Sequence, residues 1–366
     1  MFDSAWRSHP RRAEDRYLLS FAIFLVLSKK IPCLIIDKCN QENETFGSSL
    51  SNDILKHMED LSEVTLGILV FNQAPYIQDL LNSVSSQNLL PKRIVIVDNA
   101  STDASLKKLE RGVQDLGLKN ITKLVSNKFN TGSAAGLRQL LELSSTKYLA
   151  VIHGDDILSN NYISVIGQAV VKKPKVRAFN VTLLAFSSEI KTELPKSLYR
   201  PLWTNFRWLN KLLVSGLNPG VMPGSVLDRD FILRNKLLDF DEKINGVEDT
   251  LLWIRIIRAG GQIQAIPEAL YKYRIHQSQF SFDDRRNSYF FGLARRVNIS
   301  EASGFLERFL AASEISYEVK RFGKDSEYIK GLQTSYFAEF YKFKYLRIIN
   351  VMIRRLATLL IKLNYR

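Results

Sequence analysis

Short apolar runs alternate with stretches of helical periodicity between residues 64 and 153. The apolar runs, rich in Val, Ile and Leu, predict strands over 64–71, 93–98, 121–126 and 148–153. The stretches between them predict helices that begin near residues 75, 104 and 133. The strand runs are apolar almost throughout, which is typical of strands buried on both faces. The alternation therefore predicts an α/β fold, Rossmann-like, with a mixed and mostly parallel sheet flanked by helices.

The second half of the chain predicts further strands, a turn-rich loop and a helix. We expect a strand over 176–187, a loop over 218–225 followed by a short strand, and a helix over 251–258 that two glycines end. Glu248 and Asp249 lie at the start of this helix, where the helix dipole favours carboxylates. As an isolated pair they are typical of capping residues.

Composition shifts predict three regions. Residues 1–62 are expected to form an N-terminal extension and linker. The apolar stretch 18–27 is too short to span a bilayer, and a membrane-inserting segment is the alternative interpretation. Residues 63–285 are expected to form the main domain, in halves of 63–175 and 176–285. Residues 286–366 are expected to form a helical, basic C-terminal region.

Polar residues follow each of the four parallel strands predicted in the first half. They are Phe71-Asn72, Asp98 to Ser101, Asn127 to Gly132, and His153 to Asp156. Each cluster alone is consistent with a turn or a helix cap. Ligands of such sheets bind beyond the carboxyl ends of the strands, however, so four clusters at equivalent ends indicate one site.

Asp155 and Asp156 are adjacent carboxylates at the end of the fourth strand. Hard divalent cations take carboxylate oxygens and leave positions open for phosphate oxygens. The pair therefore indicates chemistry on a diphosphate, with an ordinary Gly-Asp-Asp turn as the alternative.

The formal charge of +14 predicts an anionic partner, which could be nucleic acid, an anionic membrane surface or a phosphorylated substrate. The acidic residues at the carboxyl ends of the predicted strands and the lack of a nucleic-acid-binding motif argue against nucleic acid as this partner. Residues 337–366 predict a basic amphipathic helix, which either packs on its own domain or lies on a membrane surface. Cys33 and Cys39 fit neither a zinc site nor a disulfide framework. We therefore expect a cytoplasmic protein. If the predicted helix over 337–366 lies on a membrane surface, the protein is attached peripherally to the inner face of the cell membrane.

Taken in order, these motifs resemble the family 2 glycosyltransferases, which have the GT-A fold. The resemblance runs from residue 64 to about residue 281. It rests on Ile68 to Asn72, Val95 to Asp103, Asn130-Thr131-Gly132, Asp155-Asp156, Glu248-Asp249 with Leu252 to Arg255, and Arg274-Ile275-His276.

The resemblance implies an inverting, metal-dependent enzyme that moves a sugar from a nucleoside diphosphate, UDP first among them, to a glycan or lipid-linked saccharide. Surface polysaccharide or lipopolysaccharide biosynthesis is the implied setting. A metal neutralises the departing diphosphate, and a carboxylate takes the proton of the attacking hydroxyl. By resemblance, the nucleotide-sugar is bound by Phe71, Asn72, Asp98, Asn99, Gly132 and Asp155. The acceptor or diphosphate is met by Glu248, Arg274 and His276. The ion, Mn²⁺ or Mg²⁺, is held by Asp156, with Asp155 and His276 as further ligands, and Asp249 is the general base.

His153 departs from the family pattern, which commonly has an aspartate at this place. The imidazole either contacts the metal or ribose, or is neutral and hydrogen-bonded to the backbone. The lost carboxylate also motivates the alternative of a non-catalytic relative that binds a nucleotide or glycan. Arg274 and His276 have an alternative too, in which the arginine pairs with a carboxylate on a loop and the histidine lies on the surface.

Overall fold

A computed structural model describes the domain that carries these motifs. It describes residues 63–187, 203, 210–211, 220–240, 244, 246–277, 279, 284–322 and 327–332, with positions 348, 351, 352, 355 and 359. The chain divides between Glu59 and Asp60, and everything described lies in the second unit. The N-terminal extension, its stretch 18–27 and most of 337–366 therefore lie outside the described residues. No helix of the described part is long and apolar enough to cross a membrane.

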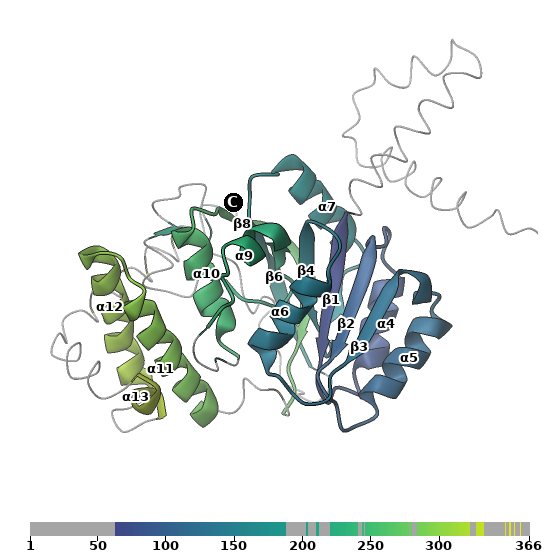
Figure 1. The fold of residues 1–366 in the computed structure, drawn as a ribbon, viewed down its shortest axis with the longest axis horizontal. Coiled ribbons are helices and arrows are strands. Elements are labelled where there is room, and N and C mark those ends of the chain that lie inside the picture. The colour runs from purple at the N-terminus through teal and green to yellow at the C-terminus, as the bar shows by residue number, and fades with distance from the viewer. Residues whose placement is uncertain are drawn as a thin grey trace, which may run out of the picture. The chain divides into compact units, whose positions relative to one another are not determined.

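Eight strands form one mixed sheet (Figure 1). In spatial order they are β3 (Thr122–Ser126), β2 (Arg93–Asp98), β1 (Val64–Val70), β4 (Tyr148–His153), β7 (Val226–Asp228), β6 (Ala178–Phe186), β8 (Ile263–Arg274) and β5 (Ile157–Leu158). β1 lies parallel between β2 and β4, and β2 pairs in parallel with β3. β7 runs antiparallel to β4 and β6, whereas β6 and β8 are parallel. The carboxyl ends of β1 to β4 therefore meet at one edge, and the predicted mixed, mostly parallel sheet is confirmed.

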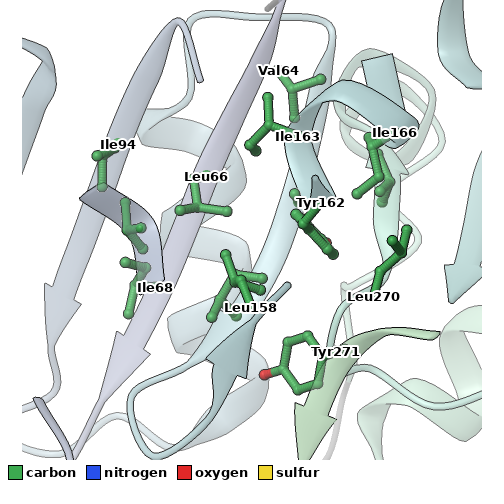
Figure 2. Packing of buried hydrophobic residues seen from close by; sticks show 14 of the residues in the cluster. Val64, Leu66, Ile68, Ile94, Leu158, Tyr162, Ile163, Ile166, Leu270 and Tyr271 are labelled. Carbon is green, nitrogen blue, oxygen red and sulfur yellow. The ribbon is translucent and has the colours of Figure 1, made fainter. Parts of the chain in front are cut away.

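Helices cover both faces of the sheet, because successive strand side chains point to opposite faces. On β2, Ile94 and Ile96 join the core of one face, and Val95 and Val97 that of the other. The first face is covered by α4 (Ile77–Ser85), α5 (Ser105–Asp115) and α7 (Tyr162–Lys172). The second is covered by α6 (Ser133–Leu143), α9 (Arg229–Arg234) and α10 (Glu248–Arg258). Figure 2 shows the first core, with Tyr271 of β8 at its border.

Three further helices pack together after the sheet: α11 (Asp284–Ser300), α12 (Phe305–Phe322) and α13 (Glu327–Leu332). Inside them, Arg295 is buried and its Nε donates to Glu318 at 3.0 Å, which also accepts from the Tyr328 hydroxyl at 2.8 Å. A buried cation needs such partners, so this network holds the three helices in register. The group is attached to α10 through Glu301, which pairs with Arg255 and, at 3.2 Å, with Arg258.

The predicted strands and helices of the first half are confirmed to within a few residues at their ends. A short 3₁₀ helix, η1 (Lys119–Ile121), takes the first residue of the run predicted as a strand over 121–126. β5 and α7, which follow Asp156, were not predicted. Tyr271 to Arg274 form the last part of β8. β8 continues that far because β6 pairs with it up to Phe186 and Arg274.

Candidate active site

Phe71 and Asn72 directly follow β1 at the carboxyl edge of the sheet. Phe71 is 43% exposed, which is unusual for a large apolar residue next to a buried strand. Asn72 has a φ of +53°, and its Oδ1 accepts from the Thr102 backbone N at 2.8 Å. Ala100, in the loop after β2, has a φ of +63°. Non-glycine residues seldom adopt this conformation, and such strain is concentrated at functional sites.

Asp98 ends β2 and is buried. Its Oδ2 accepts from the Ser126 hydroxyl at 3.1 Å and from the Ser101 backbone N at 3.3 Å. Its Oδ1 is buried and has no hydrogen-bond partner in the described part of the chain. Buried polar atoms without a partner are rare, so this oxygen is suited to accept a hydrogen bond from a ligand.

Asn99 joins the loop after β2 to the loop after β3. Its Nδ2 donates to Asn130 Oδ1 at 3.0 Å and to Gly132 O at 3.3 Å. Its Oδ1 accepts from Thr131 N at 3.0 Å and from Asn127 Nδ2 at 3.1 Å. Both ends of the amide are thus engaged by the protein. The geometry favours Asn99 as the residue that shapes this loop, and direct contact with a nucleotide stays a prediction.

Asp155 and His276 come together from the ends of β4 and β8. Both side chains are nearly buried, and Asp155 Oδ2 lies 3.0 Å from His276 Nε2. The His276 ring also packs against Tyr76 at 4.6 Å between centroids. The alternative that His276 is a surface residue is therefore wrong, since only 4% of it is exposed. An imidazole nitrogen and a carboxylate oxygen at this separation can share one ion or one proton.

Asp156 lies beside Asp155 but points into the protein. It is fully buried, and its two oxygens accept from the Tyr271 hydroxyl at 2.6 Å and from the Arg274 backbone N at 2.8 Å. Burial raises the pKa of Asp156 well above its ordinary value, and the charge of Asp155 adds to the rise. These contacts fix the turn that presents Asp155. Both oxygens of Asp156 are therefore engaged by the protein, and metal binding by Asp156 stays a prediction.

Arg274 is buried between two aromatic rings. Its guanidinium lies 4.8 Å from the Tyr76 centroid and 4.5 Å from that of Phe186. It donates to the Asp155 backbone O at 2.7 Å and pairs with Asp79 of α4 at 2.7 Å. This matches the alternative in which Arg274 pairs with a carboxylate, although that carboxylate lies on a helix rather than a loop. Through these contacts Arg274 fixes the turn that contains Asp155. Contact between Arg274 and a diphosphate stays a prediction.

The His153 imidazole is half-buried, and burial lowers its pKa. Its side chain makes no hydrogen bond to the described residues, so the backbone-bonded alternative finds no support there. Ligand atoms of His153, Asp155 and Asp156 lie within 4.8 Å of one another. A neutral imidazole next to a carboxylate is a chemically competent donor set for a transition-metal ion.

Glu248 links the two halves of the site. Its carboxylate accepts from the Ser133 hydroxyl at 2.8 Å, and the Gly246 backbone N donates to the same hydroxyl at 2.8 Å. Ser133 opens α6 directly after the loop that Asn99 shapes. Burial raises the pKa of Glu248. Ser133 was not predicted as a site residue, because a serine that begins a helix is ordinary sequence.

Asp249 is half-buried in the first turn of α10. Burial, and then the charge of Glu248, raise the pKa of Asp249 to about 7. Hydrogen bonds from Thr250 and from the backbone N of Met222 oppose this rise. A carboxylate with a pKa near neutrality is suited to take a proton and release it again.

Comparison with known proteins identifies relatives. A family model described as glycosyl transferase family 2 matches residues 65–211. An uncharacterized glycosyltransferase of Haemophilus influenzae is 28% identical over 231 residues, 61% of this chain and 69% of that protein. Poly(ribitol-phosphate) beta-N-acetylglucosaminyltransferase TarS of Staphylococcus aureus is 22% identical over 56% of this chain but 34% of its own length. The succinoglycan biosynthesis protein ExoO of Rhizobium meliloti is 24% identical over 61% of this chain and 64% of ExoO.

Solved structures share the fold. TarS residues 1–349 in complex with UDP-GlcNAc superpose with a TM-score of 0.56 at 16% identity, covering 74% of this chain and 79% of TarS 1–349. The mannosyltransferase PcManGT from Pyrobaculum calidifontis, in complex with GDP-Man and Mn²⁺, gives 0.51 at 15% identity, over 83% and 86%. At such identities the likeness establishes the fold alone.

The sheet order and the acidic residues at its carboxyl edge define an α/β protein of the GT-A type. The family model matches residues 65–211 and the relatives are glycosyltransferases, so the chain contains a glycosyltransferase family 2 domain and is a glycosyltransferase.

Proposed function

We propose that this glycosyltransferase moves a sugar, with inversion, from a nucleoside diphosphate to a hydroxyl of a glycan or lipid-linked saccharide during surface polysaccharide synthesis. The observation that carries the proposal is Asp249, whose pKa of about 7 suits a general base. The names of TarS and ExoO support an acceptor of the cell-surface polymer class. A UDP-sugar is the first donor to test, because TarS 1–349 is in complex with UDP-GlcNAc.

The residues at the strand ends have separate tasks in this proposal. The exposed ring of Phe71 stacks on the nucleobase, and the unpartnered Oδ1 of Asp98 accepts a base N–H. Asn99 holds the loop that ends at Gly132, and that loop borders the donor. Asp249 removes the proton from the acceptor hydroxyl while the hydroxyl attacks the anomeric carbon from the face opposite the leaving group. Positioning supplies much of the remaining acceleration.

A divalent ion fits the donor set at the end of β4. Asp155 and His276, whose ligand atoms lie 3.0 Å apart, would hold it. His153, whose ligand atom lies within 4.8 Å of those of Asp155 and Asp156, adds an imidazole that makes no hydrogen bond to the described residues. When bound, the ion would neutralise the charge that develops on the departing diphosphate. Asp155 replaces Asp156 as the principal ligand, since protein donors engage both oxygens of Asp156.

Manganese is the ion that this donor set favours. Of the two ions that the family resemblance implies, Mn²⁺ accepts an imidazole nitrogen more readily than the harder Mg²⁺, which prefers an all-oxygen set. His153 adds a nitrogen at the place where the family commonly has a carboxylate. PcManGT, in complex with GDP-Man and Mn²⁺, is a neighbour of the same fold and supports the choice.

A thermal-shift panel of nucleotide sugars, each with Mn²⁺ or Mg²⁺, tests the donor and the ion together. A ligand at about 100 times its Kd stabilises a protein by roughly 2.7 kcal/mol, which corresponds to about 5 °C for a domain of this size. We expect one nucleotide class to give such a shift, larger with Mn²⁺ than with Mg²⁺. His153→Asp should narrow the difference between the ions. The absence of a shift with every donor would contradict the proposed nucleotide-sugar site.

We also propose that the C-terminal region contacts an anionic membrane surface at the cytoplasmic face. Ile348, Met352 and Leu359 are helical positions that are 62%, 63% and 54% exposed. At 100° per residue these three side chains share one face, which Arg355 also shares. Exposed apolar residues beside cations suit a lipid surface with anionic headgroups.

Ile348→Glu combined with Met352→Glu should abolish most binding of the full chain to vesicles that contain phosphatidylserine, measured by co-sedimentation. Val171→Glu is the matched control, because Val171 is an exposed apolar residue on α7, 45% exposed. Equal binding by the double variant and the control would contradict the membrane proposal.

A further inference from the structure

Residues 127–132 connect β3 to α6 and are fastened to that helix at both ends. Asn127 and Gln139 exchange two side-chain hydrogen bonds of 3.0 Å each. At the other end, Gly136 N donates to Gly132 O at 3.0 Å. Gly132 has a φ of +85°, which glycine adopts without strain. This segment, which we call the donor loop, is therefore held by α6.

Ser133, the first residue of α6, uses its hydroxyl to reach a distant segment. The hydroxyl donates to Glu248 Oε2 at 2.8 Å and accepts from the Gly246 backbone N at 2.8 Å. These partners lie 115 and 113 positions later in the chain. A serine at the start of a helix commonly caps the helix to which it belongs. The hydroxyl of Ser133 instead joins the donor loop to the start of α10.

Both partners of Ser133 lie where the chain enters α10. Gly246 has a φ of +75° and turns the chain toward the helix. Val247, between the two partners, is buried in a hydrophobic core. Glu248 is 7% exposed, and a buried carboxylate is stable only when hydrogen bonds replace its lost water. The Ser133 hydroxyl supplies such a bond one residue before Asp249.

A second polar contact joins α6 to the chain before α10, but it is exposed. Arg138 pairs with Asp239 at 2.7 Å, and their side chains are 48% and 46% exposed. Ion pairs in water contribute little to stability. Glu248 is largely shielded from water, so the Ser133 hydroxyl forms the stronger of these two links.

We propose that Ser133 is a positioning residue for glycosyl transfer: a nucleotide that orders the donor loop also orders the start of α10 through this hydroxyl. Glu248 and Asp249 then take up their places for the acceptor when the donor is bound. The inference rests on the proposed function, which places the donor at the strand ends and the general base at the start of α10. It assigns a task to a residue outside the motifs of the family resemblance.

Such coupling is reciprocal. A nucleotide that favours the ordered donor loop stabilises the ordered start of α10, and the ordered start of α10 raises nucleotide affinity by the same factor. Ser133→Ala removes the hydroxyl with little change in size and separates the two segments. A hydrogen bond to a charged group supports a coupling of about tenfold.

Hydrogen exchange of backbone amides, followed by mass spectrometry of the full chain, tests the proposal. The probes are UDP and GDP, each with Mn²⁺, and the quantity compared is the exchange rate without nucleotide divided by the rate with it. In the wild type, the nucleotide that binds should slow exchange in 97–103, in 127–133 and, by about tenfold, in 246–252. In Ser133→Ala the first two segments should keep their protection, while the ratio for 246–252 falls below about twofold. The Kd for the nucleotide should rise by about tenfold at most.

This ratio distinguishes positioning from a purely structural role. If Ser133 only stabilised the fold, its loss would speed exchange in 246–252 equally with and without nucleotide, and the ratio would keep its wild-type value. That result would overturn the proposal. Ser133→Thr keeps the hydroxyl and should restore the ratio.

Ser83→Ala is the matched control. Ser83 has the same pattern of bonds on α4, since its hydroxyl donates to Leu80 O at 2.7 Å and accepts from Leu158 N at 3.1 Å. Its loss should leave the ratio for 246–252 unchanged. An equal loss of the ratio in Ser83→Ala and Ser133→Ala would exclude a specific task for Ser133.

Glu248→Gln gives a second variant for the case in which Ser133→Ala does not fold. It keeps the size of the side chain and replaces the charged acceptor of the Ser133 hydroxyl with a neutral one. The ratio for 246–252 should therefore fall by a smaller amount, and an unchanged ratio would contradict the proposal.

Failure of this inference is distinguishable from failure of the proposed function. If neither nucleotide slows exchange in 97–103 or 127–133 of the wild type, the proposed nucleotide site is contradicted. If these segments are protected and 246–252 is not, only the coupling through Ser133 fails.

Discussion

Replacing Asp249 with asparagine is expected to lower kcat by about 100- to 10,000-fold, the usual range for loss of a general base. Asparagine keeps the shape of the side chain and cannot take the proton of the acceptor hydroxyl. Release of the nucleoside diphosphate in the presence of acceptor measures the effect. Donor affinity should be nearly unchanged, because the donor is proposed to bind at the ends of β1 to β4.

The pH dependence of kcat for the wild-type protein is an independent test of Asp249 as the general base. Since the pKa of Asp249 is about 7, the base form predominates above pH 7, and kcat should fall tenfold for each unit below it. The folded pKa lies above the ordinary value, so the folded state binds a proton that the unfolded chain releases. Ionisation therefore opposes folding as the pH rises from about 4 to 7.

Asp249→Asn cannot ionise at this position and therefore avoids this loss of stability. Thermal unfolding at pH 8 should show that the variant is at least as stable as the wild type. A variant that is stable and inactive separates a catalytic role from a structural one. Wild-type transfer by Asp249→Asn would remove Asp249 from the mechanism. Donor binding by a wild-type protein that never transfers sugar would favour the non-catalytic alternative.

The second large effect is expected for Asp155→Asn. Loss of its carboxylate should weaken Mn²⁺ binding by more than about 100-fold, beyond the roughly 10- to 100-fold that follows loss of a residue supporting a ligand. Titration of Mn²⁺ followed by electron paramagnetic resonance measures this directly, without reference to activity. Donor affinity in the presence of Mn²⁺ should fall in parallel.

Asp156→Asn is the matched control, because it makes the same chemical change one residue away. Asp156 accepts from Tyr271 and from the Arg274 backbone, and its replacement should lower stability while Mn²⁺ binding changes far less. The reverse order of effects, with Asp156→Asn losing the ion and Asp155→Asn keeping it, would restore the assignment that the family resemblance suggests.

Much of the sheet is predictable from sequence because of its burial. β1, β2 and β4 are covered on both faces, so their apolar runs are nearly continuous and their polar carboxyl ends are conspicuous. The assembly of Asp98, Asn99 and Asp155 at one edge follows from parallel pairing alone. β5, by contrast, has two residues and no period to detect.

The division of labour between Asp155 and Asp156 could not be predicted in this way. It depends on Tyr271 and Arg274, which lie 115 and 118 positions away in sequence and reach Asp156 because β8 pairs with β5, the strand that follows Asp156. Two adjacent aspartates are chemically identical until their partners are known. Asn99 shows the same limit, because an amide that holds a loop and an amide that holds a nucleotide have the same sequence signature.

Helix α10 carries the proposed general base in its first turn and is joined by ion pairs to the C-terminal helices at its other end. Asp249 lies in its first turn, while Arg255 and Arg258 near its end pair with Glu301 after α11. A chimera built to exchange acceptor preference between relatives would naturally be joined after β8, near the end of the segment that resembles the family. That cut would leave two largely buried arginines without their carboxylate. The transferable module therefore extends from the start of α10 at Glu248 through Glu307 of α12, which also pairs with Arg258 at 3.2 Å.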